Sequence, residues 1–244
     1  MNNLVLQKTY PIPYSCMNCD LTLKPYSLLN YLQDIASESA QQLGFGYTYM
    51  SQNNYAWFLI KYRMEFSDYP KNLYDITFKT QPRGYNKLFA YRSFEILENE
   101  KVLGNVFSMW SVVDLNTRTT IPVQNAIQNS NMPKYEKNEE DLAFSKIKPL
   151  EKIDNKKEFL VRFNDLDVNG HANNGNYIVW AFEALPKDFI LNHKIKTLDL
   201  MFKKEAIYDE TVVSAVEYKE NNVTSHVIKN KNDEDLCLIE CQWE

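Results

Sequence analysis

The same order of predicted elements occurs twice along the chain, and this repetition constrains the fold more than any single motif. In the first half, a strand at residues 4–13 precedes a helix at residues 27–43, whose apolar side chains recur with helical spacing and stop at Gly44. Four strands are then predicted at residues 57–66, 76–80, 89–97 and 102–114. One long helix followed by strands with hairpin-like connections predicts an antiparallel sheet packed on that helix.

The second half repeats this plan with a strand at residues 157–163 and a helix at residues 174–185. Its later strands are predicted at residues 194–203, 211–218, 223–229 and 236–243. Weak echoes accompany the repetition, since Asn30-Tyr31-Leu32 resembles Asn176-Tyr177-Ile178 and Tyr74-Asp75-Ile76-Thr77 resembles Tyr208-Asp209-Glu210-Thr211. Apolar periodicity is weak between the two halves. We therefore predict an α+β chain with an N-terminal domain at 1–125, a linker at 126–150 and a C-terminal domain at 151–244.

The balance of residue types excludes several classes of protein. Hydrophobic residues make up 44% of the chain and charged residues 24%, which is typical of a soluble globular protein. The net charge of −5 shows no basic excess, so we expect no nucleic-acid partner. No segment approaches the roughly 20 apolar residues of a membrane helix, and residues 1–10 do not resemble a secretion signal. We expect a cytoplasmic protein without a membrane partner.

The cysteines give little support for a metal or redox site. Cys16 and Cys19 form a C-x-x-C pair, but no His lies near them, and Cys237 and Cys241 have a looser spacing. We interpret all four as reduced, partly buried thiols. The sequence thus predicts neither a metal ion nor a cofactor.

Residues 162–177 gather more side chains capable of chemistry than any other stretch. They hold two Asp, five Asn, two of the chain's six Gly and one of its three His, immediately before an apolar helix. Asn173 or Asn174 is suited to cap that helix through its side-chain oxygen. His171 and Asn169 would then lie just ahead of a helix N-terminus, whose free amides and positive dipole end favour a developing oxyanion.

Three interpretations of this stretch remain open. Its opening resembles a calcium loop, but the twelfth position is Asn176 instead of Glu and no helix precedes it. A purely structural role in caps and turns suits Asn173, Asn174 and Gly175 best. A catalytic role suits His171, Asn169 and Asp167, respectively as proton donor, amide donor and orienting group.

The stretch lacks a nucleophile. No Ser, Thr or Cys occurs between Phe159 and Leu191, which favours attack by water that a carboxylate activates. Glu205 is the preferred carboxylate because it follows a strand that would lie beside the helix. Judged by spacing alone, Glu183, Asp209 and Glu210 are about equally good candidates for this carboxylate.

The segment from Asn164 to Tyr177 closely resembles the N-D-x-D-x-N-x-H-x-N-N-x-x-Y signature of the acyl-acyl carrier protein thioesterases of plants and bacteria. Leu43-Gly44-Phe45-Gly46, Tyr69-Pro70 and the strand and turn at residues 110–118 resemble the same family in the same order. The resemblance implies two tandem hot-dog domains, each an antiparallel sheet wrapped around a long helix. It implies hydrolysis of the thioester that joins a fatty acyl chain to the phosphopantetheine arm of acyl carrier protein (ACP).

The resemblance also implies the residues of the active site. Asp167, Asn169 and His171 match catalytic positions of the family, and Lys203-Lys204-Glu205-Ala206 stands where the family has R-R-E-C. Ala206 at the family's Cys position argues against a Cys nucleophile and fits a water mechanism. We expect Glu205 to activate water, His171 and Asn169 to hold the thioester oxygen together with amides of the helix N-terminus, and Asp167 to position His171 and Asn169.

The acyl chain requires an apolar tunnel and the carrier a cationic surface. The predicted tunnel and other substrate-binding residues are Leu28, Leu32, Ile35, Leu43, Trp57, Phe58 and Ile60, with Asn174 and Gly175. The candidate cations for the carrier are Arg83, Lys87, Arg92, Lys203 and Lys204. A homodimer remains open. The rival functions are a hydrolase of acyl-coenzyme A and a non-catalytic acyl-thioester binding protein, which would be expected to lose Asp167, His171 or Glu205.

Overall fold

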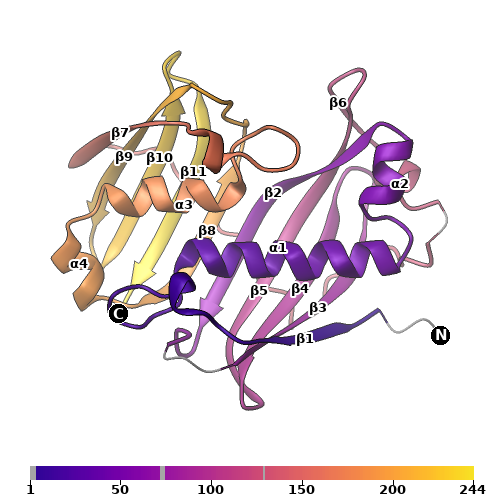
Figure 1. The fold of residues 1–244 in the computed structure, drawn as a ribbon, viewed down its shortest axis with the longest axis horizontal. Coiled ribbons are helices and arrows are strands. Elements are labelled where there is room, and N and C mark those ends of the chain that lie inside the picture. The colour runs from indigo at the N-terminus through magenta and orange to yellow at the C-terminus, as the bar shows by residue number, and fades with distance from the viewer. Residues whose placement is uncertain (1–3, 72–74, 129) are drawn as a thin grey trace.

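Figure 1 shows an antiparallel sheet with the helices on one face. The structure is a computed structural model that describes residues 4–71, 75–128 and 130–244. Strands follow one another in the order β1-β3-β4-β5-β2-β8-β11-β10-β9-β7, with β6 paired to β5. The first five of these strands come from the first half of the chain and the last five from the second half.

The elements of the first half confirm the predicted plan and extend it. The helix predicted at residues 27–43 is α1. A tight hairpin joins β4 to β5, with Asn99 and Glu100 at positive φ. The elements are β1 (Leu6–Tyr10), a 3-10 turn (Tyr14–Cys16), α1 (Pro25–Gln42), α2 (Tyr47–Gln52), β2 (Tyr55–Phe66), β3 (Ile76–Tyr85), β4 (Ala90–Glu98), β5 (Lys101–Asp114), β6 (Thr119–Ile121) and a 3-10 turn (Val123–Asn125).

The second half repeats this order. It contains β7 (Asn155–Leu160), a 3-10 turn (Phe163–Asp165), α3 (Asn174–Glu183), α4 (Lys187–Asn192), β8 (Ile195–Phe202), β9 (Thr211–Lys219), β10 (Val223–Asn230) and β11 (Asp235–Trp243). Sequence analysis missed α2, α4 and β6. Because Pro186 cannot continue α3, the chain turns there and begins α4 one residue later.

Both long helices lie on the sheet through one apolar face. Leu29, Leu32 and Ile35 of α1 are fully buried. Pro25 is the first residue of this helix, where its lack of an amide hydrogen leaves no donor unpaired. The side chain of Asn173 accepts a hydrogen bond from the amide of Gly175, which confirms the predicted cap of α3. In Figure 1 the two helices cross the front of their own halves of the sheet.

The two halves join through β2 and β8, which pair from Lys61–Met201 to Glu65–Thr197. Within this seam, the Arg63 guanidinium forms a salt bridge 2.5 Å long with the buried Asp199 carboxylate on the opposite strand. The sheet is therefore continuous across both halves, and the proposed division into domains stays a prediction.

The described part of residues 126–150 has no helix or strand, but it is closely packed. Tyr135 stacks on Tyr91 of β4 with ring centroids 4.1 Å apart. Ser145 accepts a hydrogen bond from Arg63, and Ile147 packs into a cluster on β9–β11. The segment thus lies along the sheet in both halves.

The first predicted residue echo is out of register. Pro25 and Asn174 begin equivalent helices, so the counterpart of Asn176 is Ser27 and not Asn30. The second echo includes Tyr74, which lies outside the described residues. The repetition is therefore one of element order and backbone, because the side chains of the two halves pack different neighbours.

Candidate active site

The loop at residues 163–173 is anchored at its start by Asp165. This buried carboxylate accepts hydrogen bonds from the backbone amide of Arg162 at 2.8 Å and from its guanidinium at 2.7 Å. The buried side chain of Asn176 donates to the carbonyl of Asp165 at 2.7 Å, and the amide of Asn173 donates to the same carbonyl at 2.8 Å. Asn173 and Asn176, at the start of α3, therefore hold the beginning of the loop in place.

Asp167 holds the turn that carries the other polar side chains. One of its oxygens accepts hydrogen bonds from the amides of Asn169 at 2.8 Å and His171 at 3.3 Å. The side-chain amide of Asn169 lies 3.4 Å from the other oxygen. Gly170 adopts φ +80°, where a side chain would be strained. Asp167 thus positions Asn169 and His171, as expected from the sequence.

Glu205 reaches this loop from the end of β8. The amide of Ala172 donates to the carbonyl of Ala206 at 2.9 Å. The hydroxyl of Tyr177 on α3 accepts from the buried amide of Ala206 at 2.8 Å. These bonds hold residues 204–206 against the start of α3, so the fold brings together the four residues proposed as catalytic.

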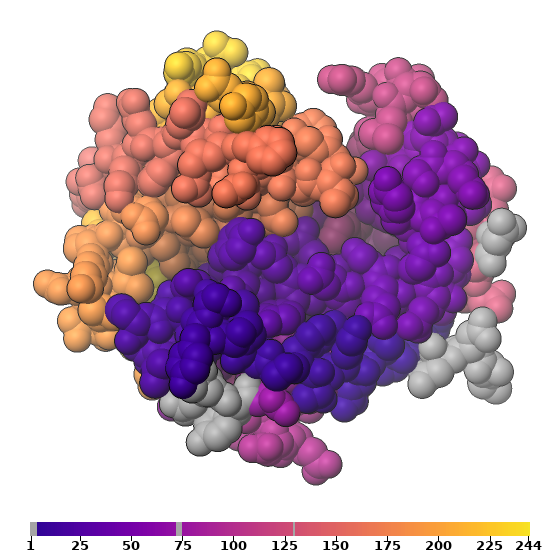
Figure 2. Space-filling model, viewed as in Figure 1, coloured from indigo at the N-terminus to yellow at the C-terminus, as the bar shows by residue number. Residues whose placement is uncertain are grey.

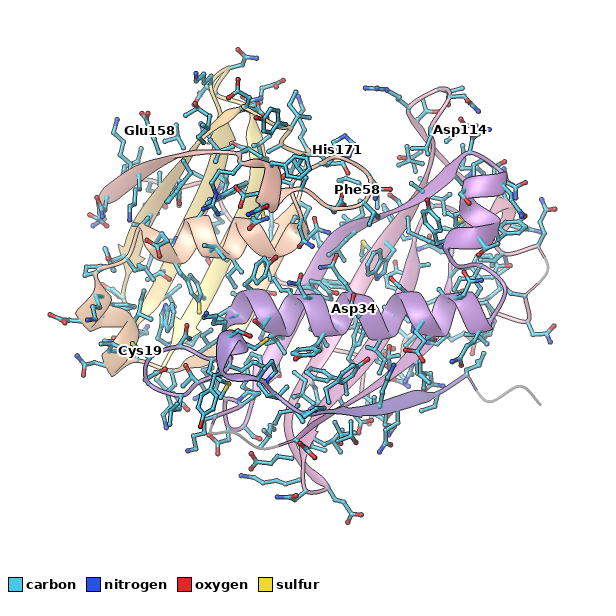
Figure 3. The ribbon with its side chains drawn as sticks, in the orientation of Figure 1. Cys19, Asp34, Phe58, Asp114, Glu158 and His171 are labelled. Carbon is cyan, nitrogen blue, oxygen red and sulfur yellow. The ribbon has the colours of Figure 1, made fainter. Side chains whose placement is uncertain are left out.

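The Nδ1 atom of His171 lies 3.3 Å from the Oε2 atom of Glu205. The two groups are close but form no hydrogen bond, and Nδ1 is shielded from solvent with no hydrogen-bond partner among the described residues. Both side chains remain partly open, at 35% and 43% exposed. Figure 3 shows His171 pointing out of the loop toward the space beside Phe58.

The pKa of Glu205 is raised above its ordinary value. Partial burial is the largest cause, and the charge of Asp167 adds to it, whereas His171 and Arg118 oppose it. Arg118 belongs to the turn between β5 and β6, so both halves of the chain set the basicity of this carboxylate. A carboxylate with a raised pKa is a better general base near neutral pH.

Two domain models of one protein family match the chain. The acyl-ACP thioesterase N-terminal domain matches residues 3–130, and the C-terminal domain of the same family matches residues 148–244. The chain belongs to the acyl-ACP thioesterase family.

Two curated relatives within this family are plant proteins. The chain is 24% identical over 99% of its length to the acyl-ACP hydrolase FATB1 of Cuphea viscosissima, and 24% identical over 83% to an oleoyl-ACP thioesterase of Coriandrum sativum. It spans 62% and 60% of those two proteins.

Solved structures of family members share the fold. An acyl-ACP thioesterase from Bacteroides thetaiotaomicron superposes with a TM-score of 0.87 at 20% identity, covering 98% of each chain. The 12:0-ACP thioesterase of Umbellularia californica superposes with a TM-score of 0.86 at 19% identity, covering 100% of this chain and 98% of that one.

The residues predicted to bind substrate fall into two groups in this family member. Leu28, Leu32 and Ile35 are fully buried in the main core. Trp57 lines a cavity of about 70 Å³ beside the C-terminal half of α1. The further lining residues that sequence analysis did not predict include Ala36, Ala40, Phe45, Ala90, Trp110 and Met132.

Phe58 and Ile60 lie on β2 at the end of the seam where β8 leads into Glu205. Figure 2 shows a hollow between the orange loop of the second half and the purple and magenta elements around α2 and β6. This hollow opens at the same end of the seam between the two halves.

Asn174 and Gly175 connect the two long helices. The side chain of Asn174 donates to Gln33 of α1 at 3.2 Å. A Cβ atom on Gly175 would lie 2.8 Å from the ring of Tyr26, so any larger residue would push the helices apart. Because Asn173 already accepts from the amide of Gly175, that amide is not free for an oxyanion.

Arg92 is not a surface cation, contrary to the prediction. It is 6% exposed, and its Nη1 atom donates to Ser39 at 3.0 Å and Thr80 at 3.1 Å. Arg92 lines the same cavity as Trp57. Burial lowers the pKa of its guanidinium to about 10. The other four predicted cations are nearer the surface. Arg83, Lys203 and Lys204 pair with carboxylates of Asp141, Asp235 and Glu234, and Lys87 is exposed.

The cysteines and possible metal ligands form no further site in the described ranges. All four cysteines are free, with Cys237 and Cys241 buried. Across residues 4–71, 75–128 and 130–244, no three His, Cys, Asp or Glu residues are grouped as metal ligands. Over the same residues, no helix is both long and apolar enough to cross a membrane.

Proposed function

We propose that the chain hydrolyses the thioester of acyl-ACP and releases a free fatty acid in fatty acid biosynthesis. The single observation that carries this proposal is the placement of the Glu205 carboxylate 3.3 Å from His171, within the loop that Asp167 holds. Family membership and the printed names of the plant relatives support acyl-ACP as the substrate.

In the proposed mechanism, Glu205 removes a proton from a water molecule, and the resulting hydroxide attacks the thioester carbonyl. His171 and the side-chain amide of Asn169 donate hydrogen bonds to the oxyanion. Collapse of the tetrahedral intermediate breaks the carbon–sulfur bond, and the thiolate takes the proton back from Glu205. Ala206 has no sulfur, so no acyl-enzyme forms at that position.

The proposal extends to the two domains of the fold. We assign residues 1–125 and 151–244 to two tandem hot-dog domains around α1 and α3, with residues 126–150 as the linker. The repeated element order and the two matched family domains support this division. The acyl chain would enter the first domain, and we expect the protein to act in the cytoplasm.

The deciding experiment compares turnover of acyl-ACP and acyl-coenzyme A thioesters that carry the same acyl chains. We expect kcat/KM to be higher for acyl-ACP, because the carrier adds a protein interface that coenzyme A lacks. Equal or faster turnover of acyl-coenzyme A would contradict the assignment of the carrier. Tight binding of both thioesters without hydrolysis would instead establish the non-catalytic alternative.

A further inference from the structure

The cavity that Trp57 lines has one charged side chain in its wall. It measures about 70 Å³ and lies between the C-terminal half of α1 and strands β2 to β5. Of its described lining residues, only Arg92 carries a charge. Because about 10–15 Å³ of such space holds one water molecule, the cavity takes a few atoms, such as the end of a chain.

The guanidinium of Arg92 is held in a fixed orientation under α1. Arg92 points inward because it is in phase with the buried Phe94 and Ile96 on β4. Its Nη1 atom donates to the hydroxyl of Ser39 on α1 at 3.0 Å and to that of Thr80 on β3 at 3.1 Å. Helix and sheet thus grip one corner of the guanidinium.

The other side of this guanidinium is unpaired. The Nε and Nη2 atoms of Arg92 have no hydrogen-bond partner among the described residues. Unlike the enclosed hydroxyl of Tyr62, these two atoms are not sealed from open space, and the side chain lines the cavity. In Arg162 the same two atoms hold the Asp165 carboxylate at 3.1 and 2.7 Å. Arg92 therefore offers the cavity a fork that fits a carboxylate.

The charge of Arg92 is not balanced by the protein around it. Arg63, Arg83 and Arg162 each form an ion pair with a carboxylate. No described carboxylate pairs with Arg92, although it is 6% exposed. Burial lowers its pKa to about 10, so the guanidinium remains charged at neutral pH. A buried charge without a counter-ion is unfavourable, and an anion in the cavity would relieve it.

The cavity lies at a suitable distance from the catalytic carboxylate for the far end of an acyl chain. In the sheet, β5 and β2 separate β4, which carries Arg92, from β8, which leads into Glu205. Three strand spacings correspond to roughly 14 Å across the sheet. The wall residues Trp110 and Trp57 lie on the two strands in between. A chain with its thioester at Glu205 would therefore end near Arg92.

We propose that the substrates of this protein include acyl thioesters whose far end carries a carboxylate, which the Nε and Nη2 atoms of Arg92 bind. Such a substrate is a half-thioester of a dicarboxylic acid, and its hydrolysis consumes water and releases the dicarboxylic acid and the thiol. The inference rests on the proposed hydrolase function and narrows its substrate class.

The first test compares kcat/KM for acyl-ACP thioesters that have the same length and end in a methyl, a hydroxyl or a carboxylate group, from the octanoyl to the dodecanoyl series. We expect the carboxylate end to be preferred over the methyl end in at least one series. In Arg92→Met this preference should fall about 10- to 100-fold, the usual value of a hydrogen bond between charged groups. A preference for methyl or hydroxyl ends throughout, or an unchanged ratio in Arg92→Met, would overturn the proposal.

Two further variants separate the fork from the charge and from the shape of the wall. Arg92→Lys keeps a positive charge but loses the planar fork, so its preference should lie between those of the wild type and Arg92→Met. This variant also keeps the test valid if Arg92→Met does not fold. Met132→Leu changes the cavity wall at nearly constant volume and should retain the wild-type preference. A loss in Met132→Leu as large as in Arg92→Lys would overturn the role of Arg92.

A binding experiment separates this proposal from the proposed hydrolysis. The Glu205→Gln protein would be titrated by calorimetry with non-hydrolysable 2-oxoalkyl thioether analogues of acyl-pantetheine that differ only at the far end. The carboxylate analogue should bind more tightly than the methyl analogue, and Arg92→Met in the same background should remove the difference. Tight binding of the carboxylate analogue by a protein that hydrolyses no thioester would refute the proposed hydrolysis and support this site. Equal or weaker binding of the carboxylate analogue would overturn the site, whatever the turnover.

Discussion

The loops at residues 14–24 and 163–173 follow the same backbone path and differ in what they can do. Each begins with a 3-10 turn. In each, the amide of the residue just before the helix donates to a carbonyl near the start of the loop, from Lys24 to Cys16 and from Asn173 to Asp165, at 2.8 Å. Only the second loop carries an imidazole opposite a carboxylate. The backbone path alone therefore does not create a catalytic site. A few side chains decide which of the two loops can be catalytic.

The loops also differ in how they are secured. Asp165 binds the chain ahead of it through charged hydrogen bonds, whereas the equivalent Cys16 makes only a weak sulfur contact with the Tyr31 hydroxyl at 3.8 Å. A loop that must hold reacting groups in place gains from such an anchor. Four predictions would break or sharpen this comparison.

The largest effect is expected from Glu205→Gln, which keeps the shape of the side chain but removes the base. The hydrolysis rate should fall by roughly two to four orders of magnitude, measured as kcat on acyl-ACP. Asp209→Asn is the control, because Asp209 is an exposed carboxylate nearby whose φ of 66° suits Asn. Near wild-type turnover of a folded Glu205→Gln protein would remove Glu205 from the mechanism.

Asp165→Ala should destabilise the fold by about 2 kcal/mol, because it removes several charge-assisted bonds from a buried position. The matching change in the other loop, Cys16→Ala, should cost less than about 1 kcal/mol. Urea unfolding of both variants measures the difference. Equal losses of stability would show that the two anchors do not differ in strength.

Leu21 and Gly170 occupy the same left-handed position in the two loops, with φ of 61° and 80°. Leu21→Gly should stabilise the protein by about 0.5–1 kcal/mol, because a Leu side chain is strained there and is largely exposed. Gly170→Ala should destabilise by about 1 kcal/mol through the backbone alone, since nothing lies within 4 Å of the added Cβ. The midpoint of thermal unfolding should rise for Leu21→Gly and fall for Gly170→Ala. A lower midpoint for Leu21→Gly would show that Leu21 is not strained.

The smallest effect concerns the charge that Arg118 contributes to the second loop. Its positive charge lowers the pKa of Glu205, so Arg118→Gln should raise that pKa and move the acid limb of kcat/KM to higher pH by less than about one unit. Activity would then be lost at low pH and retained at high pH. Lys8→Gln on β1 provides a control for net charge. A shift toward lower pH would contradict the role of Arg118, and the effect should shrink in high salt.

Much of the fold follows from hydrophobic periodicity, because elements of eight or more residues repeat their pattern several times. The short α2, α4 and β6 have too few repeats to be recognised. Arg92 carried a usable signal: it is in phase with the inward-facing Ala90, Phe94 and Ile96, which places it inside the sheet. The assumption that a cation lies on the surface overrode that signal.

The candidate site was predictable only in part. The cluster from Asp167 to His171 is local in sequence, and so is the cap at Asn173. The approach of Glu205 depends on the bonds from Ala172 and Tyr177 to residue 206, which no local pattern shows. Arg118 was visible only as part of a turn, and its influence on Glu205 arises because the two halves meet.

The pairing of β2 with β8 has a consequence for synthesis of the chain. During translation β2 emerges long before β8, so one edge of β2 has no partner strand while the first half folds. The outer edges are better protected, because β1 and β7 are short and carry lysines. Nascent chains should therefore be most prone to wrong pairing at the future seam, and the long sequence separation of its strands should make closing the sheet a slow step of folding.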